Sequence, residues 1–330
     1  MKQIRFFVCV AMALGVVEMA GAFGVSLDGS GYAARWDADT RLISNDSGQQ
    51  DRSLVDGLSW SVQGGGLDAY YQVFDFGDGT TAVQFNGLVD DAFNAWMSID
   101  EDGTGSTAAF TFNMRDEEAV GNFYFGEGVL NGAEIDLLSH PIFPLTQGGF
   151  TQRRIEYPGA GGVTLTSGVE NYGGGAIVGA DIFMSSARTW TGDEFRLVLA
   201  HELGIALGLI DVDVVDNTQQ LPLFWDDNYD PAAVTETLTN AWSGQIDPYA
   251  PEATPGLVGY SITNDSSGFD KSGVDLLMET QLPESFLGLV NPLSADEYAG
   301  RQFLYPVVPE ADAVVLVLVG ATLLGFRRRR

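Results

Sequence analysis

Residues 201–211 read HELGIALGLID, and they close the strongest helix signal in this 330-residue chain. The signal opens upstream at Thr191, because Thr191 and Glu194 have the Ser/Thr-x-x-Glu spacing of a capping box. Apolar residues then continue to Leu207, and Gly208 is a natural place for a helix to stop. The sequence therefore predicts one helix between these two caps.

This stretch resembles the zinc helix of the metzincin metalloproteases, and most closely that of the matrixin branch, whose pattern is H-E-x-x-H-x-x-G-x-x-H. In that pattern two histidines one turn apart hold a zinc ion, a third ligand returns after the glycine, and the glutamate activates metal-bound water. The resemblance implies that His201 and Asp211 are zinc ligands and that Glu202 is the catalytic general base. Aspartate occupies the third position in some metzincins, and a carboxylate can bind zinc.

The chain departs from the pattern at Ile205, which stands where the second histidine ligand belongs. An isoleucine side chain has no lone pair, and catalytic zinc normally has three protein ligands. The chain has 2 histidines, so His140 alone could replace the lost ligand, and its loop would have to reach the helix. We therefore expect an impaired zinc site and treat zinc itself as doubtful. An error at position 205 in the sequence of an ordinary protease is a further explanation.

The resemblance continues on both sides of the helix and covers roughly residues 58–305. The matching segments are an edge strand at 179–183 followed by Trp190, a first helix at 91–96, a Met-turn at 274–278, and the start of a closing helix at 294–298. The resemblance implies an α/β (α+β) fold: a twisted mixed sheet packed with an active-site helix, a Met-turn and a C-terminal helix. Met278 either lies beneath the metal site or is an ordinary core methionine.

Hydrophobic periodicity and turn-forming residues indicate the other elements and the domain limits. Strands are expected over 58–62, 108–112, 122–125, 133–138 and 176–184, a helix around the apolar stripe Val89, Ala92, Phe93 and Trp96, and a last helix over 294–304. We predict an irregular lead-in at 23–57, a domain at 58–305 and an insertion at about 212–273, because the zinc helix and the Met-turn are far apart.

The N-terminal 22 residues have the three parts of an export signal. Lys2 and Arg5 precede an apolar run, and the run ends in Ala20-Gly21-Ala22, which fits cleavage after Ala22. A short membrane anchor is the alternative. Cys9, the single cysteine, lies inside this segment, so the exported chain has neither a disulfide nor a catalytic thiol.

The segment 306–330 forms a second signal, with Val-Pro-Glu-Ala at 308–311, an apolar run at 313–326 and four terminal arginines. It resembles the bacterial PEP-CTERM sorting signal, which implies processing by an exosortase-type enzyme. A tail-anchoring helix is the alternative. The resemblance implies a cell-surface or extracellular-matrix location, with the membrane contacted only transiently through the tail. With either reading of the tail, the body of the chain is expected outside the cytoplasmic membrane.

Acidic residues dominate the charge, with 45 Asp and Glu against 16 Lys and Arg and a formal net charge of −29 at pH 7. Nucleic-acid binding needs clustered cations, so a nucleic-acid partner is excluded. Calcium is possible at two acidic loops, Asp100-Asp102-Thr104 and Asp226-Asn228-Asp230, where oxygen side chains alternate. Solvated acidic turns are the alternative for both loops.

These observations leave two kinds of function. The first is an exported, surface-sorted matrixin-like protein with an impaired zinc site, acting as a pseudoprotease or a binding module for a protein or peptide. The second is an active zinc metalloendopeptidase in which another ligand completes the site and Glu202 is the general base. The sequence alone does not decide whether the chain is an enzyme.

Overall fold

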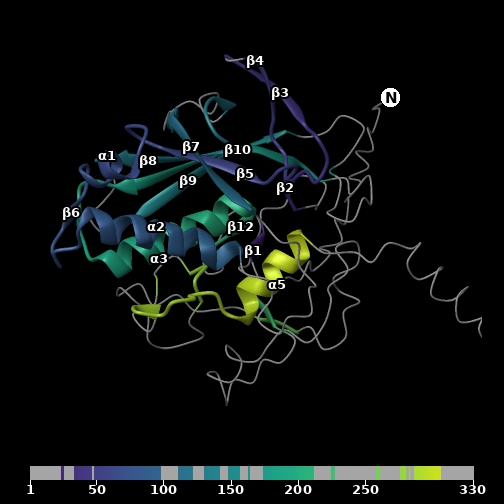
Figure 1. Cartoon of the computed structure of the whole chain (residues 1–330). Helices are drawn as coiled ribbons and strands as arrows, with labels where there is room; N and C mark the ends of the chain where they lie inside the picture. The colour runs from purple at the N-terminus through teal and green to yellow at the C-terminus, as the bar shows by residue number, and fades with distance from the viewer. Residues whose placement is uncertain are drawn as a thin grey trace, which may run out of the picture.

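A computed structural model describes residues 24–25, 33–46, 48–97, 111–121, 130–141, 148–156, 163, 174–211, 224–226, 258–260, 276–279, 282 and 286–305. The leader, the sorting tail, the acidic loop at 100–104, the expected strand at 122–125 and most of the expected insertion lie outside these residues. The described residues form an α/β structure in which a mostly parallel sheet carries helices on one face (Figure 1).

The central sheet has six strands, and five of them follow the order β2-β10-β8-β5-β7. Strand β10 pairs with β2 through its first residues and with β8 through its later ones, and the sixth strand, β9, pairs along the opposite edge of β10. Five of these strands are mutually parallel and only β9 is antiparallel. The strands are β2 (Arg35–Trp36), β5 (Leu58–Val62), β7 (Phe112–Glu118), β8 (Ile135–His140), β9 (Gly149–Glu156) and β10 (Ala176–Ser185). Every residue of β10 is buried, as expected for a central strand that is covered on both faces.

Helices α2 (Ala82–Met97) and α3 (Gly192–Leu207) lie side by side under the sheet (Figure 1). Their apolar stripes meet each other and the strands, and the indole of Trp96 in α2 donates a hydrogen bond of 2.7 Å to the carbonyl of Ala200 in α3. The short α1 (Leu67–Tyr71) packs at the start of α2, and α5 (Ala295–Leu304) closes the described chain.

Most of the expected elements are confirmed, several of them with the expected bounds. The strand at 58–62 and the helices that begin after Thr191 and Ser294 have the expected bounds, and the strands expected at 133–138 and 176–184 are β8 and β10. The expectation of an edge strand at 179–183 is wrong, because these residues lie in β10, which is paired with β8 on one side and with β9 on the other. The four stripe residues of α2 are buried. The strand expected at 108–112 lies mostly outside the described residues, and β7 begins at its last position. Strand β9 was not expected.

The N-terminal part of the chain attaches to the end of α3. Strand β1 (Gly24–Val25) pairs with β12 (Leu209–Ile210), immediately after the helix. The Trp36 indole donates a hydrogen bond of 3.0 Å to the carbonyl of Ala206, and the Tyr305 hydroxyl donates to the carbonyl of Leu207. Segments from both ends of the described chain therefore satisfy carbonyls that the last turn of a helix leaves without partners.

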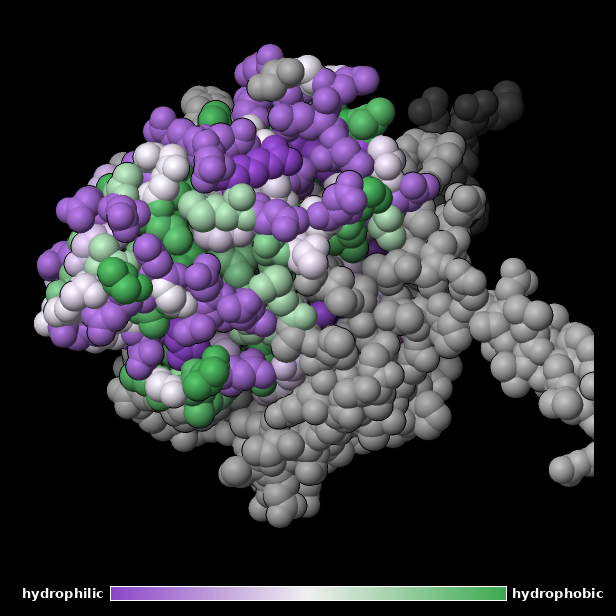
Figure 2. Space-filling model, in the orientation of Figure 1, coloured by the Kyte–Doolittle hydropathy of each residue, from purple (hydrophilic) through white to green (hydrophobic). Residues whose placement is uncertain are grey.

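Three further strand pairs lie around this framework: β3 (Leu42–Asn45) with β4 (Gly48–Asp51), β6 (Asp75–Phe76) with β11 (Thr189–Trp190), and β13 (Phe224–Asp226) with β14 (Val258–Tyr260). No helix within the described residues is long and apolar enough to cross a membrane. Hydrophilic side chains cover most of the described surface in the view of Figure 2, and hydrophobic residues appear there only in small groups.

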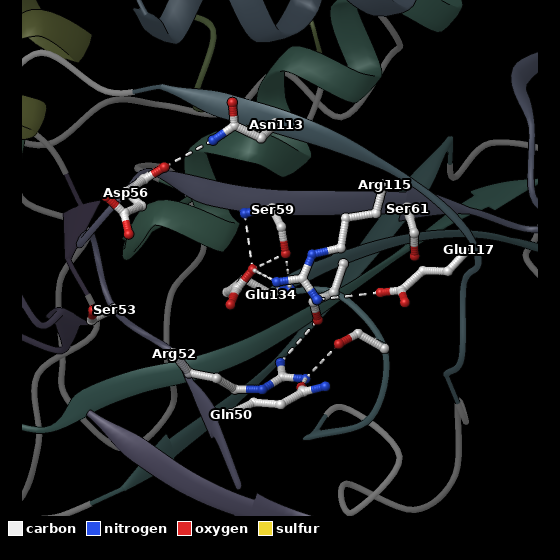
Figure 3. Close-up of polar contacts among 12 residues, drawn as sticks. Gln50, Arg52, Ser53, Asp56, Ser59, Ser61, Asn113, Arg115, Glu117 and Glu134 are labelled. Carbon is white, nitrogen blue, oxygen red and sulfur yellow. Dashed lines mark hydrogen bonds and ion pairs between the residues drawn. The ribbon is translucent and has the colours of Figure 1, made fainter. Parts of the chain in front are cut away.

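Charged side chains are buried on the face of the sheet opposite the helices. Arg52 is 0% exposed, and its guanidinium donates hydrogen bonds to the carbonyls of four residues, Leu130, Gly132, Ala133 and Val178. Its charge faces three buried carboxyl groups, those of Glu134, Asp136 and Asp181. Figure 3 shows Arg52 beside the network in which Glu134 accepts hydrogen bonds from Ser59 and faces Arg115.

Asp136 makes the stability of the chain depend on pH. Burial raises its pKa from 3.8 to about 8, against the opposing Ser61 hydrogen bond, while Asp181 raises it further and Arg52 lowers it. The folded chain therefore holds this proton more tightly than the unfolded chain, so this group's stabilisation is lost as pH rises toward 8. Replacing Asp136→Asn should reduce the fall in unfolding free energy between about pH 5 and about pH 8, measured by urea denaturation. If the unfolding free energy fell equally with pH in both proteins, the result would contradict this assignment.

Candidate functional site

Helix α3 carries the candidate site, and its ends are fixed as the sequence predicts. Thr191 accepts a hydrogen bond from the backbone N–H of Glu194, and the Glu194 carboxylate accepts one from the backbone of Thr191, which completes the capping box. At the other end Gly208 has φ of 118°, a left-handed conformation that favours glycine. The chain thus turns back after the helix and brings Asp211 toward the helix side chains.

His201 lies between a backbone carbonyl and a carboxylate. Its Nδ1 is 2.7 Å from the carbonyl oxygen of Leu277, and its Nε2 is 3.0 Å from Oδ1 of Asp211. A carbonyl can only accept, so Nδ1 carries a proton and Nε2 faces the carboxylate. Burial opposes a charge on the ring, but the hydrogen bond and charge of Asp211, with a smaller contribution from Glu202, raise the pKa of His201 to about 9. The two groups form an ion pair.

Glu202 is held by the edge strand β9. The Thr151 hydroxyl lies 2.6 Å from Oε2 of Glu202, and the Glu202 side chain is buried. A Cβ on Gly149 would come within 2.7 Å of Oε1, so the glycine leaves room for the carboxyl group. Burial raises the pKa of Glu202 to about 7, although His201 and the Thr151 hydrogen bond oppose the shift. The expected general base is therefore bound to β9 and does not bond directly to Asp211.

The turn at 276–279 supports the helix from below. Met278 is buried, and a Cβ built on Gly204 would lie 2.5 Å from its sulfur and 2.8 Å from Cζ2 of Trp96. Met278 thus packs against the helix backbone at the turn between His201 and Ile205. The neighbouring carbonyl, Leu277 O, is the one that orients His201.

Replacing Gly204→Ala should lower the unfolding free energy by about 1–3 kcal/mol, because the added methyl group overlaps Met278 and Trp96. Gly87→Ala in α2 is the matched control, because a Cβ there meets nothing within 4 Å. That variant should gain about 0.5–1 kcal/mol from helix propensity. Urea denaturation of both variants measures the difference, and a stabilised Gly204→Ala chain would show that the Met278 contact is loose.

The other expected ligand positions do not join this pair. Ile205 is half-buried and packs against the main core, and it offers no donor atom. His140 ends β8, and its ring contacts Phe183 at 6.3 Å between centroids, in a cluster separate from the core that surrounds α3. Within the described residues, no group of three or more His, Cys, Asp or Glu side chains could hold a metal ion.

The distance between the two expected ligand atoms is also shorter than it would be around a bound zinc ion. Two atoms that bind one tetrahedral zinc at about 2.0–2.2 Å lie about 3.3–3.6 Å apart. His201 Nε2 and Asp211 Oδ1 are closer, at 3.0 Å, and contact each other directly. Of the positions considered as ligands, the structure brings His201 and Asp211 together, and neither Ile205 nor His140 adds a donor beside them. Of the two loops expected for calcium, 100–104 and 226–230, only Asp226 is described, and it lies in strand β13.

The sequence did not indicate Thr151 or the Leu277 carbonyl, although both contact the expected site residues. No protein-family model matches the chain, and no curated protein matches it in sequence.

Proposed function

We propose that this chain is an exported, surface-sorted, matrixin-like protein with an impaired zinc site, which acts as a pseudoprotease that binds extended peptides. The observation that carries this proposal is the His201–Asp211 pair. Two of the expected ligands lie on one side of α3 at 3.0 Å, and the position that would supply the third is Ile205. The arrangement keeps two ligand positions of a metal site but lacks the third ligand atom.

The surrounding parts support the family resemblance. A mixed sheet lies over an active-site helix, a methionine turn packs beneath that helix at Gly204, and a capped helix follows at the C-terminal side. These are the parts that the resemblance implies. The leader and the tail extend the proposal to export, to cell-surface or extracellular-matrix sorting, and to processing by an exosortase-type enzyme.

Strand β9 supports peptide binding. It pairs with β10 on one side, and no described strand pairs with its other edge. Thr151 joins this edge strand to Glu202, so the open edge runs beside the His201–Asp211 pair. An extended peptide can add to such an edge through backbone hydrogen bonds.

Zinc analysis tests the impaired site. The purified chain is equilibrated with zinc, dialysed against metal-free buffer and measured by elemental analysis, with a peptide-hydrolysis assay alongside. We expect far less than one zinc per chain and no hydrolysis. About one zinc per chain that is lost in His201→Ala would favour the active zinc endopeptidase, with Glu202 as its general base.

A further inference from the structure

The two faces of β9 have different roles. Thr151 bonds Glu202, Arg153 donates to the carbonyl of Leu209, and Ile155 packs against the main core. These alternate residues therefore point toward α3 and β12. Because side chains alternate along a strand, Phe150, Gln152 and Arg154 lie on the opposite face.

The register with β10 gives each residue of that opposite face its neighbour within the sheet. Phe150 lies opposite Phe183, Gln152 opposite Asp181, and Arg154 opposite Gly179. Glycine has no side chain, so β10 offers Arg154 no cross-strand partner. A residue on a strand added to the free edge would be the cross-strand neighbour of Arg154 on the other side.

Arg154 is also unusual among the described arginines. It is exposed, and no carboxylate among the described residues pairs with it. The other described arginines are buried, paired with acids or bonded to carbonyls: Arg35, Arg41, Arg52, Arg115, Arg153, Arg188, Arg196 and Arg301. A single available cation on this edge stands out in a chain of net charge −29.

We propose that β9 selects an extended peptide with a bulky apolar residue opposite Phe150 and one acidic residue opposite Arg154, four positions away. Phe150 is 38% exposed, so its ring can cover an apolar neighbour, and Arg154 pairs with the carboxylate. The net charge of −29 repels peptides with many acids, which limits the ligand to a local carboxylate. This inference rests on the proposed peptide binding at β9.

Fluorescence anisotropy with the full chain tests the selection. The probes are labelled eight-residue peptides of Val and Thr that carry Phe and, four positions away, Glu, Gln or Lys. The Glu peptide should bind about threefold to fivefold more tightly than the Gln peptide, and the Lys peptide should bind least, because a favourable cross-strand pair contributes up to about 1 kcal/mol.

A charge exchange supplies the control. Arg154→Glu should reverse the order, so that the Lys peptide binds best, and the exposed position should leave the urea midpoint unchanged. Equal binding of all three peptides to the unaltered chain would overturn the selection while leaving strand addition intact. If none of the peptides binds, both the selection and the proposed peptide-binding function are overturned.

Discussion

Ile205→His should hold about one zinc ion per molecule after dialysis, where we expect the unaltered chain to hold far less. Position 205 lies one helical turn after His201 on the same face, so the new imidazole faces the same space. Asp211 already lies 3.0 Å from Nε2 of His201, and the ligands need to separate by only a few tenths of an ångström to share a metal. The Leu277 carbonyl already fixes the His201 tautomer that presents Nε2.

Elemental analysis after dialysis measures the gain, and the thermal midpoint should rise with added zinc because the ion binds only the folded chain. The double variant His201→Ala/Ile205→His is the control, since it restores one histidine while removing the other, and it should return to the unaltered chain's zinc content. A folded Ile205→His chain that holds no zinc would contradict the assignment of His201 and Asp211 as remnants of a metal site.

Arg52→Met should lower the unfolding free energy by about 3 kcal/mol or more at neutral pH, because it leaves four backbone carbonyls without the hydrogen bonds that the guanidinium donates. Three of these carbonyls belong to residues 130–133 and the fourth to Val178. The bonds therefore join the segment after β4 to the segment that leads into β8 and to β10. The loss should therefore appear as a lower urea midpoint for the whole domain rather than as local fraying.

Arg154→Met is the matched control, since it removes a guanidinium from the same sheet at an exposed position. Its unfolding free energy should stay within about 0.5 kcal/mol of the unaltered chain. An equally neutral Arg52→Met would contradict the assignment of these four hydrogen bonds as a stabilising link across the sheet.

The sequence was most informative where local chemistry alone determines the structure. A capping box and a glycine stop fix the two ends of α3. Both signals lie in the residues at the helix ends, so they can be read without knowing the rest of the fold. The glycine stop also brought His201 and Asp211 together, because the turn at Gly208 is encoded beside them. Strand β5 and the stripe of α2 were predictable because their apolar residues face one core.

Strand β9 could not be predicted from periodicity. Its inward positions include Thr151 and Arg153, which are polar, and its outward positions include Gln152 and Arg154, so no alternation of apolar and polar residues appears. Its identity depends on pairing with β10 and on the bond to Glu202, which is 51 residues away in sequence. Contacts of this kind depend on the fold and leave no local signal.

Arg52 illustrates the same limit in the lead-in. The residues around it are rich in Gly, Ser, Asp and Asn, a composition typical of irregular chain. The structure instead places two strands there, β3 and β4, and sends the arginine into the sheet. A long side chain that finds four carbonyl groups across the fold cannot be recognised from its neighbours in sequence.

The bonds at the end of α3 also determine how the domain responds to force. Tyr305 joins the last described residues to Leu207, and Arg35 joins the early chain to Leu304 through a hydrogen bond of 2.7 Å. Trp36 in β2 also donates a backbone hydrogen bond to the Tyr305 hydroxyl, so tension applied along the chain beyond Tyr305 reaches both the end of α3 next to Asp211 and the sheet. A domain tethered at that side would register mechanical load at its candidate site as well as in its sheet.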